Sequence, residues 1–168
     1  GAVEGRRAAV AALSEFRGVE ANVAVVSALQ DEDPVVRATA VGQLRERGIR
    51  GAMNTLLDLV DSPDKEVRDV ALEALSEFTF ERFFAVFGTL DDETLAETAL
   101  FVRRVDPDMF DGLKQELRSP IRVHRIRAIQ MAIAMNVIAD VEPLVIELLG
   151  DTDHIIRSAA ADALVHSP

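Results

Sequence analysis

The chain has 168 residues, a formal net charge of −11 and no cysteine. Its 49% hydrophobic content is enough for a continuous core, and the lack of cysteine excludes disulfides, thiolate metal sites and cysteine nucleophiles. The acidic balance argues against general nucleic-acid binding, because phosphate contacts supply most of that affinity. No apolar run spans a membrane and no apolar signal region follows a basic start, so we expect a cytoplasmic protein without membrane insertion.

A motif built around an arginine recurs along the chain. A β-branched residue precedes the arginine, an alanine follows three positions later and an apolar residue follows seven positions later. The clearest copies are Val36-Arg37…Ala40…Leu44, Val67-Arg68…Ala71…Leu75 and Ile156-Arg157…Ala160…Leu164. Weaker copies begin at Arg6 and Arg125, and a degenerate copy has Ala96 in place of arginine. The anchors lie 28 to 32 residues apart, a period that predicts a stacked array of repeats.

Each period predicts two short amphipathic helices joined by an acidic turn. A lone helix of the second type is expected at about 4–16. The pairs that follow are 19–29 with 34–47, 51–60 with 64–78, 80–89 with 92–104, 107–118 with 121–136, and 141–149 with 153–165. The turns carry Asp and Pro, which suit the first turn of a helix, and Asp64 is one expected N-cap. They lack the glycine and closing glutamate of a calcium loop, so capping is favoured over calcium binding.

The arginine near the start of each second helix has two interpretations. It either binds an anionic ligand, or it belongs to a structural ladder that bonds carboxylates or helix-end carbonyls of adjacent repeats. An aspartate lies four residues before three of these arginines, which favours the ladder. The predicted ladder residues are Arg37, Arg68, Arg157, Asp33, Asp64 and Asp153.

The pattern Asp-x-x-Val-Arg-x-x-Ala-x-x-Ala-Leu resembles HEAT repeats, especially the short repeats of phycobilin lyase-like proteins. The resemblance covers nearly the whole chain. It implies an all-α fold, a right-handed α-α superhelix in which first helices lie on the convex side and second helices line a concave surface. We therefore expect a HEAT-like solenoid of five helix pairs plus a leading half-repeat, forming one domain over residues 1–168. The family's usual role is to hold another macromolecule.

Motifs for catalysis are missing. Some proteins of the resembled fold are metal-dependent hydroxylases with His-Glu pairs, but this chain has no such dipeptide. His124, His154 and His166 share no metal-ligand spacing, and no Gly-x-Ser-x-Gly, Walker or Gly-x-Gly-x-x-Gly motif occurs. We therefore expect a protein that is not an enzyme and that has neither a cofactor nor a metal.

Two local features stand out from the repeats. Seven of the eight phenylalanines lie between 78 and 110, and four share one predicted helix face: Phe80, Phe83, Phe84 and Phe87. This face indicates either a locally bulky core, or an exposed groove or oligomer contact. Residues 103–127 carry a net charge of +3 in a chain whose remainder is −14. If they face the concave side, the candidate partner-binding residues are Arg103, Arg104, Arg122, Arg125 and Arg127; the alternative is a solvated, internally paired face.

These observations favour a non-enzymatic scaffold that binds a protein, with an acidic peptide or segment as the candidate partner, through the concave surface. The alternative is a tetrapyrrole (bilin) lyase-like or chaperone protein, which would require an apolar groove near the phenylalanines. The array ends on Ile155, Ile156, Ala160 and Leu164 without an evident polar cap, so we expect a fragment of a longer protein or a surface completed by a partner. Gly1-Ala2 fits either a protease scar or native sequence.

Overall fold

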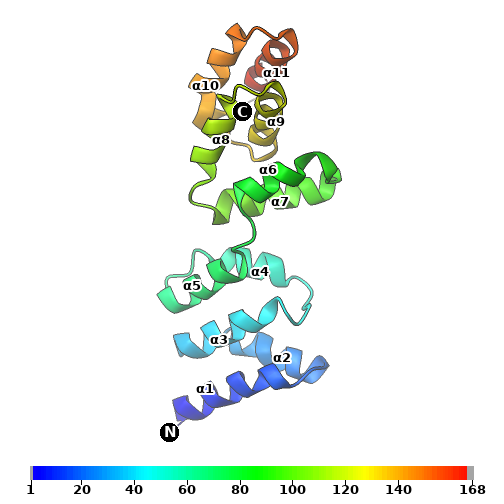
Figure 1. The fold of residues 1–168 in the computed structure, drawn as a ribbon. Coiled ribbons are helices and arrows are strands. Elements are labelled where there is room, and N and C mark those ends of the chain that lie inside the picture. The colour runs from blue at the N-terminus through cyan, green and yellow to red at the C-terminus, as the bar shows by residue number, and fades with distance from the viewer. Residues whose placement is uncertain (1, 166–168) are drawn as a thin grey trace. The chain divides into compact units, whose positions relative to one another are not determined.

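A computed structural model describes residues 2–165, and α-helices with short 3₁₀ turns are the regular elements of that range (Figure 1). The helices pack in stacked pairs, so the predicted all-α, HEAT-like architecture is confirmed. The chain divides into two compact units, Gly1–Glu77 (unit 1) and Phe78–Pro168 (unit 2), which we describe separately.

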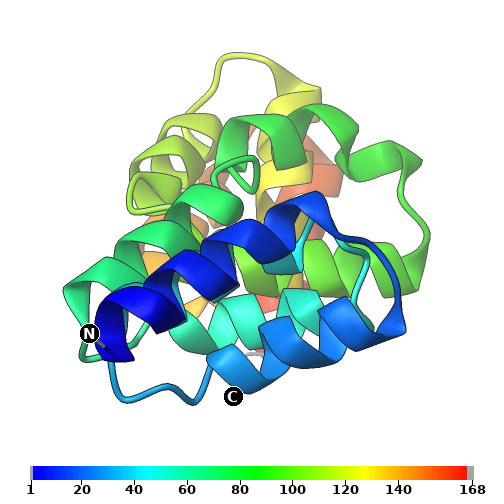
Figure 2. The same cartoon turned by 90° about the horizontal axis from the view of Figure 1, so that it is seen from below.

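Unit 1 contains a lone helix followed by two helix pairs. The elements are α1 (Ala2–Ala12), η1 (Leu13–Glu15), α2 (Val19–Ala28), α3 (Pro34–Leu44), α4 (Ala52–Leu59) and α5 (Lys65–Ala74). The second-type helices α1, α3 and α5 lie side by side, with α3 in the middle, and α2 and α4 pack on one side of this row (Figures 1 and 2). The core between them consists of small and medium aliphatic side chains, among them Val36, Ala40, Leu44, Leu56 and Ala71.

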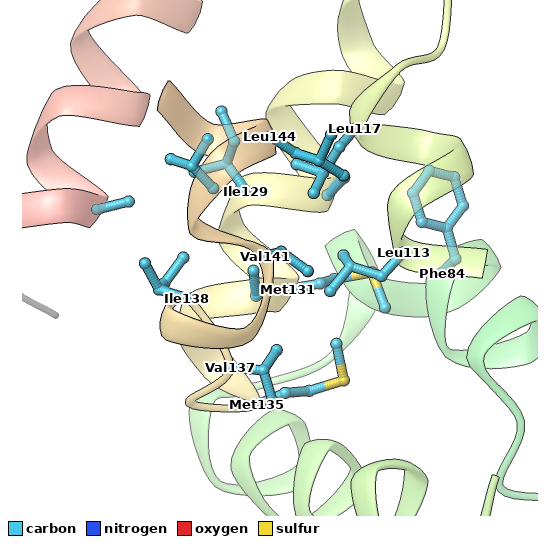
Figure 3. Close-up of a cluster of buried hydrophobic side chains, with 14 of the residues drawn as sticks. Phe84, Leu113, Leu117, Ile129, Met131, Met135, Val137, Ile138, Val141 and Leu144 are labelled. Atoms are coloured by element: carbon cyan, nitrogen blue, oxygen red, sulfur yellow. The ribbon is translucent and has the colours of Figure 1, made fainter. Parts of the chain in front are cut away.

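Unit 2 contains three helix pairs. The elements are α6 (Phe80–Val86), η2 (Phe87–Thr89), α7 (Asp92–Val105), α8 (Met109–Leu117), α9 (Arg122–Ala134), η3 (Ala139–Val141), α10 (Glu142–Glu147), η4 (Leu148–Gly150) and α11 (His154–Val165). Helix α9 packs against α8 and α11, and α6 contacts α7, α8 and α9. Large side chains fill the core, including Leu113, Leu117, Ile129, Met131 and Met135 (Figure 3).

The aromatic helix face predicted at 80–87 lies in this core. Phe83 is 1% exposed, and Phe80, Phe84 and Phe87 are also buried. The rings contact one another, with centroids 5.5 Å apart for Phe83 and Phe87 and 5.8 Å apart for Phe80 and Phe84. The interpretation as a bulky core is therefore confirmed, and the interpretation as an exposed aromatic groove is wrong. The bulky side chains fill the volume between α6 and its neighbours.

Acidic turn residues begin several helices as predicted. The carboxylate of Asp33 accepts the Val36 amide over 3.0 Å, and that of Asp91 accepts the Thr94 amide over 2.9 Å. Each bond satisfies a backbone donor that the first helical turn leaves without an intrahelical partner. Asp64 occupies the N-cap position of α5, but its side chain makes no cap hydrogen bond.

Helix α9 ends two residues before the predicted boundary at 136. Asn136 has a φ of +53°, the left-handed conformation that follows many helix ends. The Val137 amide then donates to the Ala132 carbonyl oxygen over 2.9 Å, and the Asn136 amide donates to Ile133 over 2.9 Å. This arrangement satisfies the last carbonyls of α9 and turns the chain toward α10.

Candidate functional site

The arginine near the start of a second helix holds the turn that precedes that helix. Its guanidinium donates to the backbone carbonyl oxygen six residues earlier. This bond occurs in four repeats, as Arg37 to Asp31, Arg68 to Ser62, Arg125 to Ser119 and Arg157 to Asp151. It measures 2.8 Å in the last two. Because such carbonyls lie just beyond a first helix, where no intrahelical donor remains, the arginine satisfies them and fixes the turn.

In unit 1, arginines of helix α1 also reach the turn of the following repeat. Arg6 donates to Asp31 over 2.9 Å and to Glu32 over 2.8 Å. Arg7 makes two bonds to the carboxylate of Asp33, over 3.0 and 2.7 Å. Two-point contacts of this kind match the geometry of a guanidinium to that of a carboxylate. The α1 helix is thereby tied to the turn between α2 and α3.

We call each set of ion pairs between an arginine of one repeat and the acidic turn of the following repeat a rung. The next rung of unit 1 joins Arg37 to Asp64. The guanidinium of Arg37 lies between the carbonyl oxygen of Asp31 in its own turn and the carboxylate of Asp64 in the following turn. The Arg37 side chain is 20% exposed and that of Asp64 36%. The carboxylate of Asp64 pairs with Arg37 and makes no cap hydrogen bond. By contrast, the carboxylate of Asp33 both pairs with Arg7 and caps α3.

The ion pairs of the first rung, between α1 and the turn before α3, shift the pKa values of the residues that form them. The Arg7 guanidinium lowers the pKa of Asp33 to about 2, and the pKa of Arg7 is raised by the same bond. The pKa of Asp31 is lowered first by the Asp33 amide and then by Arg6. Asp33 therefore remains ionised well below neutral pH, and its ion pair with Arg7 persists there.

In unit 2, the rungs join α9 to the turn before α11. Arg125 bonds both carboxylate oxygens of Asp151, over 2.8 and 3.3 Å, and Arg122 pairs with Asp153. The Arg125–Asp151 pair is well shielded, with side chains 15% and 8% exposed, whereas Arg122 is 46% exposed. Backbone amides are the main cause of the lowered pKa of both aspartates, and the arginines add to it.

The predicted ladder residues thus meet partners that sequence spacing did not reveal. Each of the three predicted aspartates pairs with an arginine of the preceding repeat: Asp33 with Arg7, Asp64 with Arg37 and Asp153 with Arg122. Arg68 and Arg157 hold their own turns. That these contacts stabilise the fold stays a prediction.

Four residues of the rungs were missed in the sequence. Asp31 and Asp151 take the first position of their turns, six residues before Arg37 and Arg157. Arg7 follows the anchor at Arg6, and Glu32 follows Asp31. The recurrence of aspartate at the first turn position is a signal that could have identified two of the four.

Three of the five candidate partner-binding arginines lie along α9. Arg122 and Arg125 sit at its N-terminal end, where they meet the aspartates described above. Arg127 donates to the Phe84 carbonyl oxygen over 2.8 Å, and its guanidinium carbon lies 5.1 Å from the centre of the Phe84 ring. Arg127 therefore joins α9 to α6.

The other two candidates, Arg103 and Arg104, end α7. Arg103 donates to the Met135 carbonyl oxygen over 3.1 Å, which places it at the C-terminal end of α9. The length of α9 separates this point from Arg122 by about 20 Å. The structure therefore brings Arg122 and Arg125 together beside an acidic turn and places Arg103 at the opposite end of the helix. Their part in partner binding stays a prediction.

Exposed apolar side chains recur on the second helices at one position of the repeat, two residues before the ladder arginine. Val35 is 38% exposed, Val123 53% and Ile155 44%. Leu100 on α7 and Ile133 on α9 add further exposed apolar surface, at 49% and 51%. Single exposed apolar residues are ordinary, but the recurrence of Val123 and Ile155 on the packed helices α9 and α11 indicates a face of unit 2 that another protein can cover.

The two histidines among residues 2–165 show no arrangement for metal binding. His124 lies in the β-branched position of its repeat, with Nδ1 2.8 Å from a Glu116 carboxylate oxygen and its ring centre 5.2 Å from that of Phe84. Within residues 2–165, no group of three or more histidine, cysteine or acidic side chains is placed to hold a metal ion. His154 begins α11, and His166 lies outside the described residues.

Comparison with known proteins agrees with the repeat architecture. Residues 2–78 match the family of HEAT repeats. The match supports no assignment to the phycobilin lyase type. No curated protein matches the chain. Among the described residues, no helix is both long enough and apolar enough to cross a bilayer.

Proposed function

We propose that the chain is a non-enzymatic scaffold that binds a protein partner through the exposed face of the second helices of unit 2. HEAT repeats generally serve as protein-interaction scaffolds, because stacked helix pairs present an extended surface. The observation that carries the proposal is the exposure of Val123 and Ile155 at one position of the repeat on α9 and α11, which pack against each other in unit 2. Apolar side chains of this kind provide the anchors of an interface, and polar residues surround them.

The arginines around this face divide into two groups. Arg125 and Arg127 are largely shielded by their internal partners, so we assign them to the fold. Arg103, Arg104 and Arg122 are exposed, and we assign them to the polar rim of the interface. The exposed pair of Arg122 with Asp153 contributes little to stability, so Arg122 can exchange this aspartate for a partner carboxylate at small cost. This rim favours an acidic segment of the partner.

A capture experiment tests the surface. The double variant Val123→Asp/Ile155→Asp places charges on the second helices, and Ile146→Asp on α10 is the matched control, since Ile146 is 50% exposed. Immobilised protein is incubated with cell extract, and captured proteins are identified by mass spectrometry. We expect the double variant to lose partners that the wild type and the control retain, with circular dichroism unchanged. Equal capture by all three proteins would exclude this surface.

The acidic character of the partner has its own test. The triple variant Arg103→Gln/Arg104→Gln/Arg122→Gln removes the charges of the rim and leaves Arg125 and Arg127 in place. We expect salt-sensitive capture to weaken, because rim charges act through screened, long-range attraction. Capture that is insensitive both to salt and to the triple variant would remove the acidic partner from the proposal.

The tetrapyrrole alternative gains no support from the aromatic cluster, because its rings are buried. A hollow of about 380 Å³ lies beside Phe80, but Glu81, Asp106, Asp108 and Asp111 contribute to its lining. Carboxylates repel the propionate groups that a bilin carries. We therefore expect no spectral change when a bilin is titrated into the protein, and a saturable absorbance shift would reinstate this alternative.

A further inference from the structure

Helix α2, the first helix of a pair in unit 1, leaves one apolar face uncovered. Helix α2 is apolar on most of its circumference, and a helix of this kind is normally enclosed by its surroundings. Val25 is completely buried against the rest of unit 1. On other positions of the same helix, Val19 is 75% exposed, Val23 60% and Val26 44%. Their spacing of four and three residues places these valines on one face.

A hollow of about 360 Å³ lies between this face and the turn that precedes α4. Its lining residues are Val19, Asn22, Val23, Val26 and Ser27 of α2 and Gly48, Ile49 and Arg50 of the turn. Gly48 and Gly51 have φ values of +59° and +79°, a conformation in which glycine carries no steric penalty. These two glycines allow the chain to turn back beside α2.

Arg47 holds the start of this turn in place. Its guanidinium donates to Asn22 Oδ1 over 3.1 Å, to the Phe16 carbonyl oxygen over 3.2 Å and to the carbonyl oxygen of Leu13. It also bonds Gln43 on α3 over 2.8 Å. One side chain thus connects η1, α2 and α3 to the chain just before Gly48. The hollow is therefore built before any partner arrives, which lowers the entropy lost on binding.

The arginine at the edge of the hollow lacks the carboxylate partner that the arginines of the rungs in unit 1 have. Arg6, Arg7 and Arg37 are paired with carboxylates, whereas Arg50 has no hydrogen-bond or ion-pair partner among residues 2–165. Arg50 is exposed and lies beside an apolar wall. In an acidic chain, an arginine left without a carboxylate next to exposed valines is complementary to an acidic group that arrives with apolar side chains.

From this geometry we propose that the hollow between α2 and residues 48–50 docks an amphipathic helical segment of a partner protein. The apolar side chains of the segment lie against Val19, Val23 and Val26, and a carboxylate of the segment pairs with Arg50. Helices commonly bind grooves in this way, with anchors at i, i+3 or i+4, and i+7. This surface belongs to a first helix, so the inference goes beyond the second-helix interface and names a second docking site.

A peptide-display selection tests the proposal. A library of random 16-residue peptides is selected on the intact chain and counter-selected on the variant Val23→Asp/Arg50→Glu. We expect the enriched peptides to carry aliphatic residues at helical spacing together with Glu or Asp. The matched control is Val86→Asp/Arg82→Glu on α6 in unit 2, where Val86 is 43% exposed and Arg82 is exposed. A selection in which no peptide remains after the counter-selection would overturn the proposal.

The affinity of an enriched peptide for the variants measures the two parts of the site. We expect Val23→Asp to weaken binding at least tenfold, as is typical when an apolar anchor is replaced at the centre of an interface. Arg50→Glu should weaken binding of the acidic peptide and improve binding of a peptide with Lys at the same positions. Loss of binding to both peptides equally would show that Arg50 does not read charge and would contradict its assigned role.

Two other occupants are distinguished by separate measurements. Analytical ultracentrifugation that finds a dimer dissociated by Val23→Asp would assign the face to a second copy of the chain and overturn the proposal. Sedimentation with phosphatidylcholine–phosphatidylserine vesicles, abolished by the same substitution, would assign the face to a lipid surface and also overturn it. Because the second-helix interface is tested with Val123 and Ile155, either proposal can fail while the other holds.

Discussion

The two units hold the same helix-pair motif together by different means. In unit 1, Arg6, Arg7 and Arg37 tie the second-type helices α1 and α3 to the following turns, and the core consists of small and medium aliphatic side chains. In unit 2, Ala96 replaces the ladder arginine of the first repeat, and phenylalanines and methionines fill the core. The difference shows that a HEAT-like repeat can lose a rung where larger apolar side chains supply the contact between neighbouring helices.

The largest expected effect concerns the aromatic core of unit 2. Phe83→Ala removes a ring that is 1% exposed and should lower the free energy of unfolding by about 3–5 kcal/mol, through lost burial and a cavity. Chemical denaturation followed by circular dichroism measures the loss. Val86→Ala on the same helix is the control, since Val86 is 43% exposed and should change stability by less than about 0.5 kcal/mol. Equal losses would show that Phe83 does not pack as described.

The next effect concerns the rung that unit 2 retains. Arg125→Met keeps the length of the side chain but leaves the Asp151 carboxylate, which is 8% exposed, without its guanidinium partner. We expect a loss of about 1.5–3 kcal/mol in the free energy of unfolding, because hydrogen bonds to charged groups contribute on this scale. Arg122→Met removes the more exposed rung and should cost less. A larger loss from Arg122→Met would reverse the assignment of the two arginines to fold and interface.

A smaller expected effect concerns how tightly helices pack in the two units, at Gly112 in unit 2 and Gly5 in unit 1. A β-carbon added at Gly112 on α8 would lie 2.5 Å from Cδ1 of the buried Phe80 ring, so Gly112→Ala must displace the ring. We expect a net loss of about 1–2 kcal/mol, since overpacking exceeds the gain in helix propensity. Gly5→Ala in α1 meets no atom within 4 Å and should stabilise unit 1 by about 0.5–1 kcal/mol. Thermal unfolding of the single variants and of Gly112→Ala/Phe80→Leu, which should recover stability, tests this account.

The smallest effect is a shift in acid titration in unit 1. Because the folded pKa of Asp33 is about 2, below its ordinary 3.8, its ionised form stabilises the fold above pH 4, and this contribution is lost as pH falls toward 2. Arg7→Gln removes the main cause of the depression, so the pKa of Asp33 should move toward 3.8. Carboxyl NMR measures both values. Asp91 is the internal control, because backbone and side-chain hydrogen bonds from Thr94 lower its pKa without an arginine; an unchanged Asp33 would refute the rung.

Local chemistry explains how much could be read from the amino acids. Periodic apolar positions and the acidic turns predicted every helix pair, because amphipathic spacing and capping act over a few residues. The recurrence of Arg37, Arg68 and Arg157 predicted stacking, because a fixed period repeats the same local unit. The predicted end of α9 at 136 was two residues too late, because the left-handed conformation of Asn136 ends the helix and is not encoded in the apolar pattern.

Tertiary structure alone decided which groups meet. The sequence contained Asp33 four residues before Arg37, but stacking pairs Asp33 with Arg7 and leaves Arg37 to bond Asp64. It showed an aromatic face at 80–87, but only packing against α8 and α9 determined that this face is buried while the valines of α2 remain exposed. Both outcomes depend on the distances between helices far apart in sequence, which residue spacing does not specify.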